Sequence, residues 1–256
     1  MPVHEVAQRG FGSEAETYDR ARPSYSAEAV AWLVENLGIR SGSRAADLAA
    51  GTGKFTKLLL PTGADVLPVE PVEGMWRVLR TTVPDLPITA ATAEALPFAA
   101  ASLDALTVAQ AFHWFDADRA FAELARVLRP GGRVGIIWNV RDRADDWVNQ
   151  VWSIMDRVEK RAPWRDHDKW SDTAFGERRG FGPLHSAEFR NEQQVTPDDV
   201  VDRIASVSHV VVLPDDQREA VLDEVRAIVD THPDTAGRTE LTIPYRVDAY
   251  WCERLP

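Results

Sequence analysis

Segments with strand-like and helix-like patterns alternate along the first half of the chain, and this alternation constrains the fold most. The first pair is a short apolar segment over 44–48 and a helical pattern over 54–60, joined by a glycine-rich turn. The alternation continues to the apolar run over 133–138. Strands that alternate with helices form a parallel sheet with right-handed crossovers and helices on both faces. The sequence therefore predicts a doubly wound α/β fold.

We expect a Rossmann-like, mostly parallel sheet of seven strands, with helices before it and a helical insertion after its fifth strand. The expected strands cover 44–48, 65–69, 87–90, 103–109, 133–138, 184–195 and 239–251. The expected helices cover 13–20, 27–37, 54–60, 73–82, 117–128, 145–160, 197–205 and 215–230.

Charge and cysteine content exclude several classes of partner. The net charge of -11 would repel a phosphate backbone, so a nucleic-acid substrate is disfavoured. Cys252 is the only cysteine, and the six histidines show no metal-ligand spacing, so we expect no disulfide and no metal. No stretch reaches the roughly 20 apolar residues of a membrane span. We expect a cytoplasmic protein without a membrane partner.

The turn after the first strand carries the main chemical signal. Gly51 and Gly53 allow a tight turn and a close approach of a ligand to the following helix. Lys54 is followed by Phe55 rather than Ser or Thr, so the turn is not a phosphate-binding loop of the P-loop type. Asp47, four residues before Gly51, instead suits a cationic group of the ligand.

Glu70 lies at the expected end of the second strand, 19 residues after Gly51. An acidic side chain at this place can accept both hydroxyls of a ribose, in NAD or in S-adenosylmethionine. The plainer alternative is a carboxylate at a strand end that binds nothing.

Taken in order, these motifs resemble those of class I S-adenosylmethionine-dependent methyltransferases of the type 11 group, similar to the trans-aconitate and ubiquinone-biosynthesis enzymes. The resemblance implies S-adenosyl-L-methionine as cofactor and S-adenosyl-L-homocysteine as product. It implies that the glycine motif is carried by Asp47, Ala49, Gly51 and Gly53, the ribose acid and the following turn by Glu70, Pro71 and Met75, and the adenine contact by Ala93 and Glu94.

Ala49 occupies the position where the family usually has its first glycine. A methyl group fits there if the backbone φ is negative, so we expect a slightly altered loop.

Two further segments resemble the same subgroup. In the N-terminal one, Tyr18 and Arg22 are expected to reach the methionine end of the cofactor, and Tyr25 to border the acceptor. Ordinary packing is the alternative for these residues. The second segment follows the fourth strand and contains Gln110, His113 and Trp114, which should line the space between the cofactor and the acceptor.

The resemblance implies one methyltransferase domain over 1–256. Its parts are an N-terminal helical cap (1–40), a cofactor-binding core (41–139), a helical or lid insertion (140–183) and a C-terminal part that completes the sheet (184–256). We expect a monomer or a homodimer.

Methyl transfer from a sulfonium can rely on proximity and alignment alone. The expected acceptor is a small molecule, methylated on a carboxylate or hydroxyl oxygen. A hydroxyl acceptor would use a base, and His113 is the best-placed candidate. With a carboxylate acceptor, His113 would only orient the substrate.

Two other functions share this fold: an NAD-dependent oxidoreductase and a non-catalytic cofactor-binding protein. The tryptophans Trp138, Trp147, Trp152, Trp164, Trp170 and Trp251 are expected mainly in the core. Arg141 and Arg143 follow the fifth strand and could hold an acidic acceptor, although we favour solvated charges for both.

Overall fold

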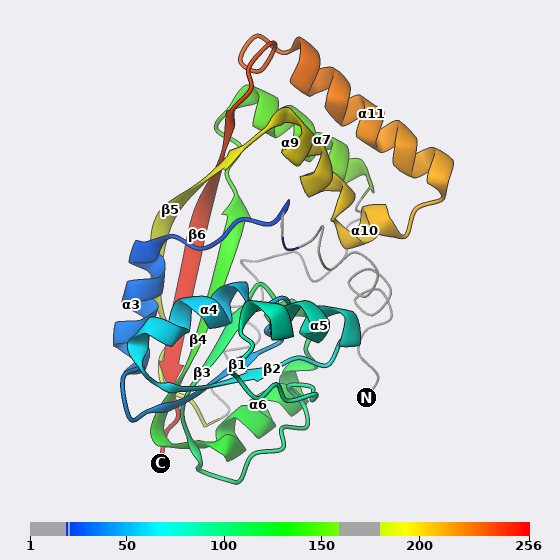
Figure 1. Cartoon of the computed structure of the whole chain (residues 1–256). Coiled ribbons are helices and arrows are strands. Elements are labelled where there is room, and N and C mark those ends of the chain that lie inside the picture. The colour runs from blue at the N-terminus through cyan, green and yellow to red at the C-terminus, as the bar shows by residue number, and fades with distance from the viewer. Residues whose placement is uncertain (1–18, 20, 159–179) are drawn as a thin grey trace.

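The structure is a computed structural model that describes residues 19, 21–158 and 180–256. Its centre is a six-stranded sheet in the order β2-β1-β3-β4-β6-β5 (Figure 1). The strands are β1 (Arg44–Leu48), β2 (Asp65–Val69), β3 (Leu103–Ala109), β4 (Leu128–Arg141), β5 (His185–Val195) and β6 (Leu241–Glu253). The pairs among β2, β1, β3 and β4 are parallel, whereas β6 runs antiparallel to both β4 and β5. The Rossmann-like α/β class is confirmed.

The predicted strand over 87–90 is wrong: within the described residues the sheet has six strands, not seven. Thr89 forms only an isolated parallel bridge with Val69. The run is four residues long, and Pro87 has no N–H to donate to a ladder, so a regular strand does not form.

The helices follow the predicted pattern closely. They are α3 (Ala27–Leu37), α4 (Lys54–Leu59), α5 (Glu73–Thr82), α6 (Ala117–Val127), α7 (Asp146–Val158), α9 (Pro197–Ala205), α10 (Ser208–Val211) and α11 (Asp215–Thr231), with 3-10 turns η1 (Leu60–Thr62) and η2 (Phe112–Trp114). No sequence pattern predicts the four-residue α10. The predicted helix over 13–20 lies almost entirely outside the described residues.

The helix ends have identifiable causes. Ser26 accepts a hydrogen bond from the N–H of Ala29 and begins α3, and Gly38 ends it in the left-handed conformation at φ 66°. Thr196 and Asp199 form a reciprocal capping box at the start of α9. Local signals thus fix both elements before any tertiary contact.

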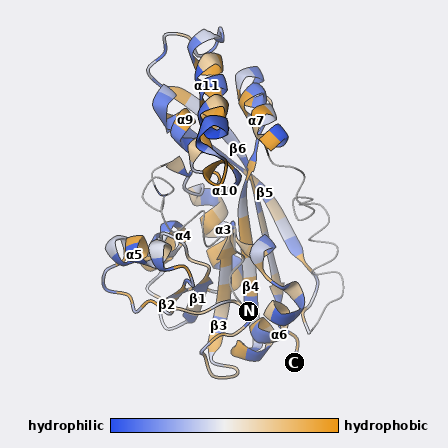
Figure 2. Cartoon of the chain, turned by 90° about the vertical axis from the view of Figure 1, so that its right-hand side faces the viewer, coloured by the Kyte–Doolittle hydropathy of each residue, from blue (hydrophilic) through white to orange (hydrophobic). Residues whose placement is uncertain are grey.

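The long strands β4, β5 and β6 extend past the shorter β1, β2 and β3, and α7, α9, α10 and α11 gather at that end (Figure 1). A separate cluster of buried side chains joins α7, α9 and α11 to the ends of the long strands. Figure 2 shows hydrophobic residues gathered on the central strands, whereas α11 carries both hydrophobic and hydrophilic residues. This helical end borders the sheet edge at which a ligand would bind.

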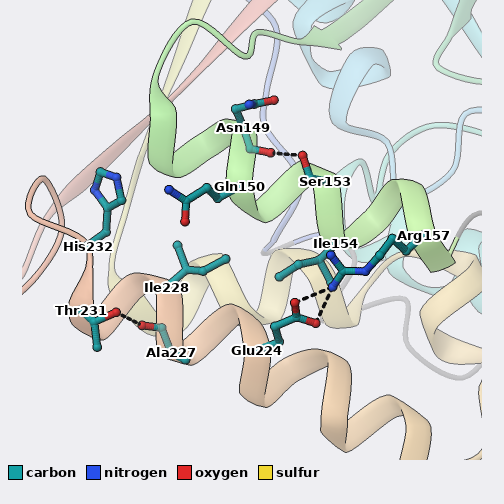
Figure 3. Close-up of a pocket in the computed structure, with 10 residues that line it drawn as sticks. All are labelled: Asn149, Gln150, Ser153, Ile154, Arg157, Glu224, Ala227, Ile228, Thr231 and His232. Carbon is teal, nitrogen blue, oxygen red and sulfur yellow. Dashed lines mark hydrogen bonds and ion pairs between the residues drawn. The ribbon is translucent and has the colours of Figure 1, made fainter.

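A groove of about 510 Å³ lies between α7 and α11 (Figure 3). An ion pair between Arg157 and Glu224, with an N–O distance of 2.6 Å, joins the two helices there. No residue of the glycine-rich turn contributes to the groove, so it is separate from the site described below.

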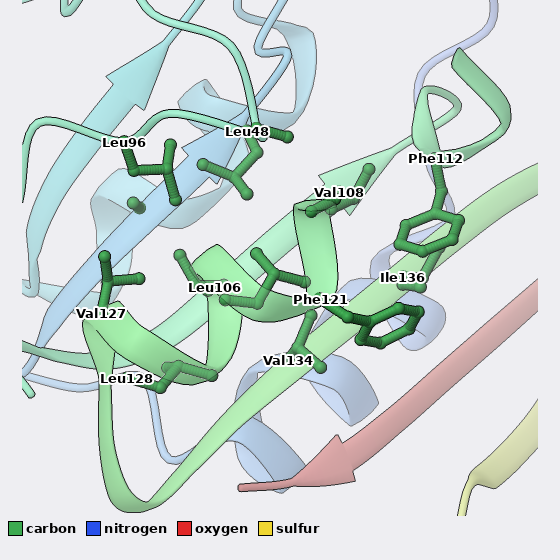
Figure 4. Close-up of a cluster of buried hydrophobic side chains, with 14 of the residues drawn as sticks. Leu48, Leu96, Leu106, Val108, Phe112, Phe121, Val127, Leu128, Val134 and Ile136 are labelled. Atoms are coloured by element: carbon green, nitrogen blue, oxygen red, sulfur yellow. The ribbon is translucent and has the colours of Figure 1, made fainter. Parts of the chain in front are cut away.

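The core has one cluster on each face of the sheet. On one face, α3 and α4 pack on the strands, through residues such as Leu33, Phe55 and Ile137. On the other face, α6 packs through residues such as Phe121 and Val127 (Figure 4). Because strand side chains alternate between the faces, odd-numbered residues of β4 point to the α3 side and even-numbered ones to the α6 side. Among the described residues, no helix is both long and apolar enough to cross a membrane.

Candidate active site at the carboxyl edge of the sheet

The glycine-rich turn leaves β1 and enters α4 with three residues at positive φ. Gly51 and Gly53 have φ of 58° and 89°, and Ala49 has φ of 51°. The negative φ under which a methyl group at position 49 would fit without strain is therefore not adopted. Ala49 keeps the left-handed conformation suited to glycine, because the N–H of the next residue, Ala50, is tied to the carbonyl of Val69 at 3.0 Å.

Glu70 lies directly after β2 and is only 4% exposed. Its Oε2 accepts a hydrogen bond from the N–H of Gly51 at 2.8 Å, and its Oε1 accepts one from the N–H of Val72 at 2.7 Å. Burial raises the pKa of Glu70 to about 7, although both backbone bonds act in the other direction. The carboxylate is therefore a fixed part of the turn and titrates near neutrality.

Asp47 lies inside the sheet, fully buried beneath the turn. Its two oxygens accept hydrogen bonds from the hydroxyls of Thr56 at 2.6 Å and Thr107 at 2.8 Å. Burial raises the pKa of Asp47 to about 6, despite these two hydrogen bonds. The side chain thus ties β1 to α4 and β3.

The residues expected at the ribose and the adenine lie on the neighbouring loops and in α5. Pro71 is partly exposed beside Glu70, and Met75 is buried in α5. Ala93 is buried, and Glu94 accepts a hydrogen bond from the N–H of Asp116, just before α6, at 2.9 Å. The turn with Ala93 and Glu94 therefore belongs to the rim of the same edge.

Gln110 follows β3 with φ of 60°, a strained conformation for a residue with a side chain. Its N–H donates to the carbonyl of Ile137, and its side-chain amide donates to the carbonyl of Asn139 at 3.2 Å. These bonds to β4 hold the strained backbone. Strain of this kind clusters at functional sites, which supports a site here.

His113 and Trp114 lie in η2, which begins two residues after Gln110, and both are partly buried. The His113 ring contacts the Trp114 ring at 4.8 Å between centroids and stacks with the Trp138 ring at 6.4 Å. An imidazole between two indoles is held in a defined orientation.

Asp19, a residue that the sequence did not single out, contacts the glycine-rich turn. The Thr52 hydroxyl donates to Asp19 at 2.6 Å, and the Lys54 ammonium lies 3.6 Å from the same carboxylate. The one sequence feature that pointed to this contact is the polar residue Thr52, which lies between Gly51 and Gly53. These contacts place Asp19 against the glycine-rich turn.

The other N-terminal candidates are placed as follows. Arg22 donates to the carbonyl of Ser206 at 3.4 Å, beside the end of α9. The Tyr25 ring packs edge-on against Phe55 of α4 at 5.2 Å. Tyr18 lies outside the described residues.

Among the tryptophans, Trp138, Trp147 and Trp152 are buried, as expected, and Trp251 is partly buried. Trp164 and Trp170 lie outside the described residues.

The two arginines after β4 differ from each other. Arg143 is solvent-exposed and forms a bidentate pair with Asp156 at 2.8 Å. For Arg141 the expectation of a solvated charge is wrong, because its guanidinium lies 4.5 Å from the centre of the Trp152 ring. Antiparallel pairing with β6 places Arg141 opposite Tyr245, beneath the helical end.

Comparison with known proteins agrees with this geometry. A methyltransferase domain family matches residues 46–136. An uncharacterized methyltransferase of Mycobacterium tuberculosis is 40% identical over 235 residues, which cover 92% of this chain and 91% of the relative.

Solved structures show the same fold. A structure reported as a type II methyltransferase from Anaeromyxobacter dehalogenans superimposes with a TM-score of 0.69 at 26% identity, over 92% of this chain and 99% of that one. A Haemonchus contortus phosphoethanolamine N-methyltransferase, solved with phosphomonomethylethanolamine and S-adenosylhomocysteine, covers all of this chain and 60% of its own length, with a TM-score of 0.58 at 14% identity.

These matches favour methyl transfer over hydride transfer and over a non-catalytic binding role. The relative that is 40% identical over 92% of this chain shows membership of a family, which a shared fold alone would not show. The chain belongs to the class I S-adenosylmethionine-dependent methyltransferases of the type 11 group.

Proposed function

We propose that this protein binds S-adenosyl-L-methionine at the turn between β1 and α4 and transfers its methyl group to an oxygen of a small-molecule acceptor. The observation that carries the proposal is the pair of hydrogen bonds that fix Glu70 against Gly51 and Val72. A carboxylate offers about four lone-pair directions, so two directions are left for the hydroxyls of a ribose. The residues at the end of β2 therefore fit a nucleoside.

The turn itself would hold the rest of the cofactor. Gly51 presents backbone without a side chain, and a methyl group added there would meet only the carbonyl of Ala49, at 4.0 Å. Space and exposed backbone suit the close approach of a ligand. Asp47 lies beneath the turn and accepts hydrogen bonds from the hydroxyls of Thr56 and Thr107. We therefore assign Asp47 the role of stabilising the shape of the turn, rather than direct binding of the cationic group of the cofactor.

Glycine is required at position 53 for a different reason. A methyl group on Gly53 would lie 2.5 Å from a methyl of Leu79 in α5, so this position serves close helix packing. The expected cofactor contacts of Ala93, Glu94 and Gln110 stay predictions, as does that of Arg22.

When bound, S-adenosylmethionine supplies a methyl group on a sulfonium, whose C–S bond breaks as the acceptor oxygen attacks, with the electron pair remaining on sulfur. A carboxylate acceptor already carries the attacking lone pair, whereas a hydroxyl must lose its proton to a base. We assign His113 the role of orienting the acceptor, because its ring is held against Trp114 and Trp138 at the end of β3. Alignment is then the main contribution of the protein.

Titration calorimetry with S-adenosylhomocysteine and NAD tests the proposal. We expect binding of S-adenosylhomocysteine with a micromolar Kd, a loss of about tenfold or more in Glu70→Gln, and no binding of NAD. Arg77→Gln, an exposed change in α5, is the control. Binding of NAD alone, or an unchanged Kd in Glu70→Gln, would refute the site.

A further inference from the structure

A cavity of about 330 Å³ lies at the amino end of the parallel strands, opposite the carboxyl edge. Its walls come from the segment 37–43, which joins α3 to β1, and from residues 129–133 at the start of β4. Asp104, the second residue of β3, also lines it. In Figure 1 this end of the sheet lies near the C-terminus, away from α7, α9 and α11. The cavity is therefore separate from the proposed cofactor site.

Positive charge dominates the lining of this cavity. Arg40, Arg129 and Arg133 line it, together with one carboxylate, that of Asp104. The whole chain has a net charge of -11, so this lining reverses the prevailing sign. Guanidiniums gathered around an open space attract an anion into it.

Arg133 forms a fixed wall of the cavity. Its Nε and Nη2 donate to one oxygen of Glu253 at 3.1 and 3.0 Å, and its Nη1 donates to the carbonyl of Asn36 at 2.7 Å. The last contact covers a carbonyl at the end of α3 that would otherwise repel an anion. Because Glu253 balances the charge of Arg133, the other two arginines are the ones that can serve a ligand.

Arg129 keeps hydrogen-bond donors that its ion pair does not use. Its Nη1 lies 2.8 Å from one oxygen of Asp104, and the other oxygen of Asp104 accepts the N–H of Arg44 at 2.7 Å. A guanidinium has five N–H donors, and within the described part of the chain Arg129 makes no other side-chain contact. Its side chain is 60% exposed, so the remaining donors are accessible.

Arg40 supplies the charge that no acid balances. Its guanidinium has no hydrogen-bond or ion-pair partner among the residues that the structure describes. Its backbone is fixed, because the N–H donates to the hydroxyl of Ser43 at 2.9 Å and the carbonyl accepts from that hydroxyl at 2.7 Å. A methyl group added to Gly38 would lie 3.9 Å from Nη1 of Arg40, so the guanidinium lies over the end of α3, beside the cavity.

The lining also leaves room for a ligand. Gly42 and Gly131 belong to it, and a methyl group added to either would meet no atom within 4 Å. From the charge, the unused donors and this open space, we infer that the cavity is a second ligand site, which takes a small molecule bearing an oxyanion of charge -2 or more. Arg40 and Arg129 donate to its oxygens, because planar guanidiniums match the geometry of carboxylates and phosphates.

Calorimetric titration of the full chain with citrate, inorganic phosphate and acetate tests this inference. At an ionic strength of about 0.15 M, where distant exposed charges are screened, we expect citrate or phosphate to bind at least about tenfold more tightly than acetate. Arg40→Gln should weaken that binding by about tenfold or more, the usual effect of losing a charge-assisted hydrogen bond. Arg226→Gln, an exposed change in α11, removes the same charge and should leave binding unchanged.

A second variant should bind anions more tightly, a result that misfolding cannot produce. Asp104→Asn removes the negative charge from the lining and keeps an oxygen for the N–H of Arg44, so it should tighten binding by about threefold or more. Preference for citrate identifies a polycarboxylate ligand, and preference for phosphate a phosphate ester. Equal binding of all three anions, or unchanged binding in both Arg40→Gln and Asp104→Asn, would overturn the inference.

The second site is independent of the cofactor proposal. The Kd of S-adenosylhomocysteine, measured separately, should stay within about threefold of wild type in Arg40→Gln and Asp104→Asn, because both residues lie at the far end of β1 and β3. Failure of S-adenosylhomocysteine to bind would refute the cofactor site and leave the anion titration unchanged.

Discussion

The Glu70 carboxylate accepts a hydrogen bond from the N–H of Gly51 at 2.8 Å, and this bond joins the end of β2 to the turn after β1. Two adjacent parallel strands are thereby linked at the edge where a nucleoside would lie. Because the same carboxylate has a pKa near neutrality, cofactor binding and proton binding compete at one group.

Cofactor affinity should therefore depend on pH. Only the ionised Glu70 can accept both ribose hydroxyls, and the pKa of about 7 means that this form is lost as pH falls below 7. We expect the Kd of S-adenosylhomocysteine to be about tenfold lower at pH 8 than at pH 6, and nearly constant above pH 8. Calorimetry in two buffers of different ionisation enthalpy should also show proton release on binding at pH 6.5.

Glu70→Gln is the control for this pH dependence. The variant should bind more weakly throughout and show a flat profile between pH 6 and 8. An equally steep profile in Glu70→Gln would assign the titration to another group.

Asp47 should make the free protein less stable as pH rises. Its pKa is about 6 in the folded chain against 3.8 in the unfolded one, so folding takes up a proton between these values. The stability that this proton provides is complete below pH 3.8 and is lost as pH rises through 6. Relative to Asp47→Asn, wild type should lose about 1.5 kcal/mol of stability between pH 5 and pH 7.5.

Thermal unfolding at the two pH values measures this difference. Asp85→Asn, on an exposed turn, changes the net charge equally and should keep a constant difference from wild type. A constant difference for Asp47→Asn as well would show that Asp47 titrates normally.

Much of this fold could be predicted from the chain because local and tertiary signals agree. In α9, the Thr196 cap and the apolar spacing of Val200 and Ile204 predict a helix over 197–205, and the structure has these bounds. The strand predicted over 87–90 does not form, because its pattern is only four residues long and Pro87 has no N–H to donate to a neighbouring strand. Short patterns do not outweigh a missing backbone donor.

The site was less predictable, because its contacts join residues far apart in sequence. Asp19 and Thr52 are 33 residues apart, and no periodicity connects them. Arg203 did leave a signal: it lies on the buried side of α9, between Val200 and Ile204, where a charged residue is out of pattern. That signal indicates burial of a charge, but only the folded chain brings Arg141 to it.

Ala49→Gly should stabilise the protein without changing the cofactor site. Ala49 has φ of 51°, which costs an L-residue about 1–2 kcal/mol, partly offset by the greater entropy of glycine in the unfolded chain. We expect a net gain of about 1 kcal/mol and a rise in Tm of about 2–4 °C. The Kd of S-adenosylhomocysteine should change less than about threefold, because the turn already has the conformation that glycine would adopt.

Ala101→Gly is the matched control for this change. Ala101 has φ of 53° in an exposed turn, so it should give the same thermal shift and no effect on binding. Much tighter binding in Ala49→Gly alone would mean that the alanine distorts the turn.

His113→Ala separates the two roles that remain open for this imidazole. If His113 orients the acceptor, the variant should raise KM by about tenfold and leave kcat within a factor of about three, since no proton transfer is lost. A fall in kcat of about a hundredfold or more, with loss of the acidic limb of the pH profile, would identify a general base and a hydroxyl acceptor. The measurement uses the first acceptor that a turnover screen finds. Arg77→Gln, an exposed change in α5, should change neither constant by more than about threefold. The kcat and KM of His113→Ala therefore identify both the role of His113 and the kind of acceptor oxygen, because a carboxylate acceptor needs no base and a hydroxyl acceptor does.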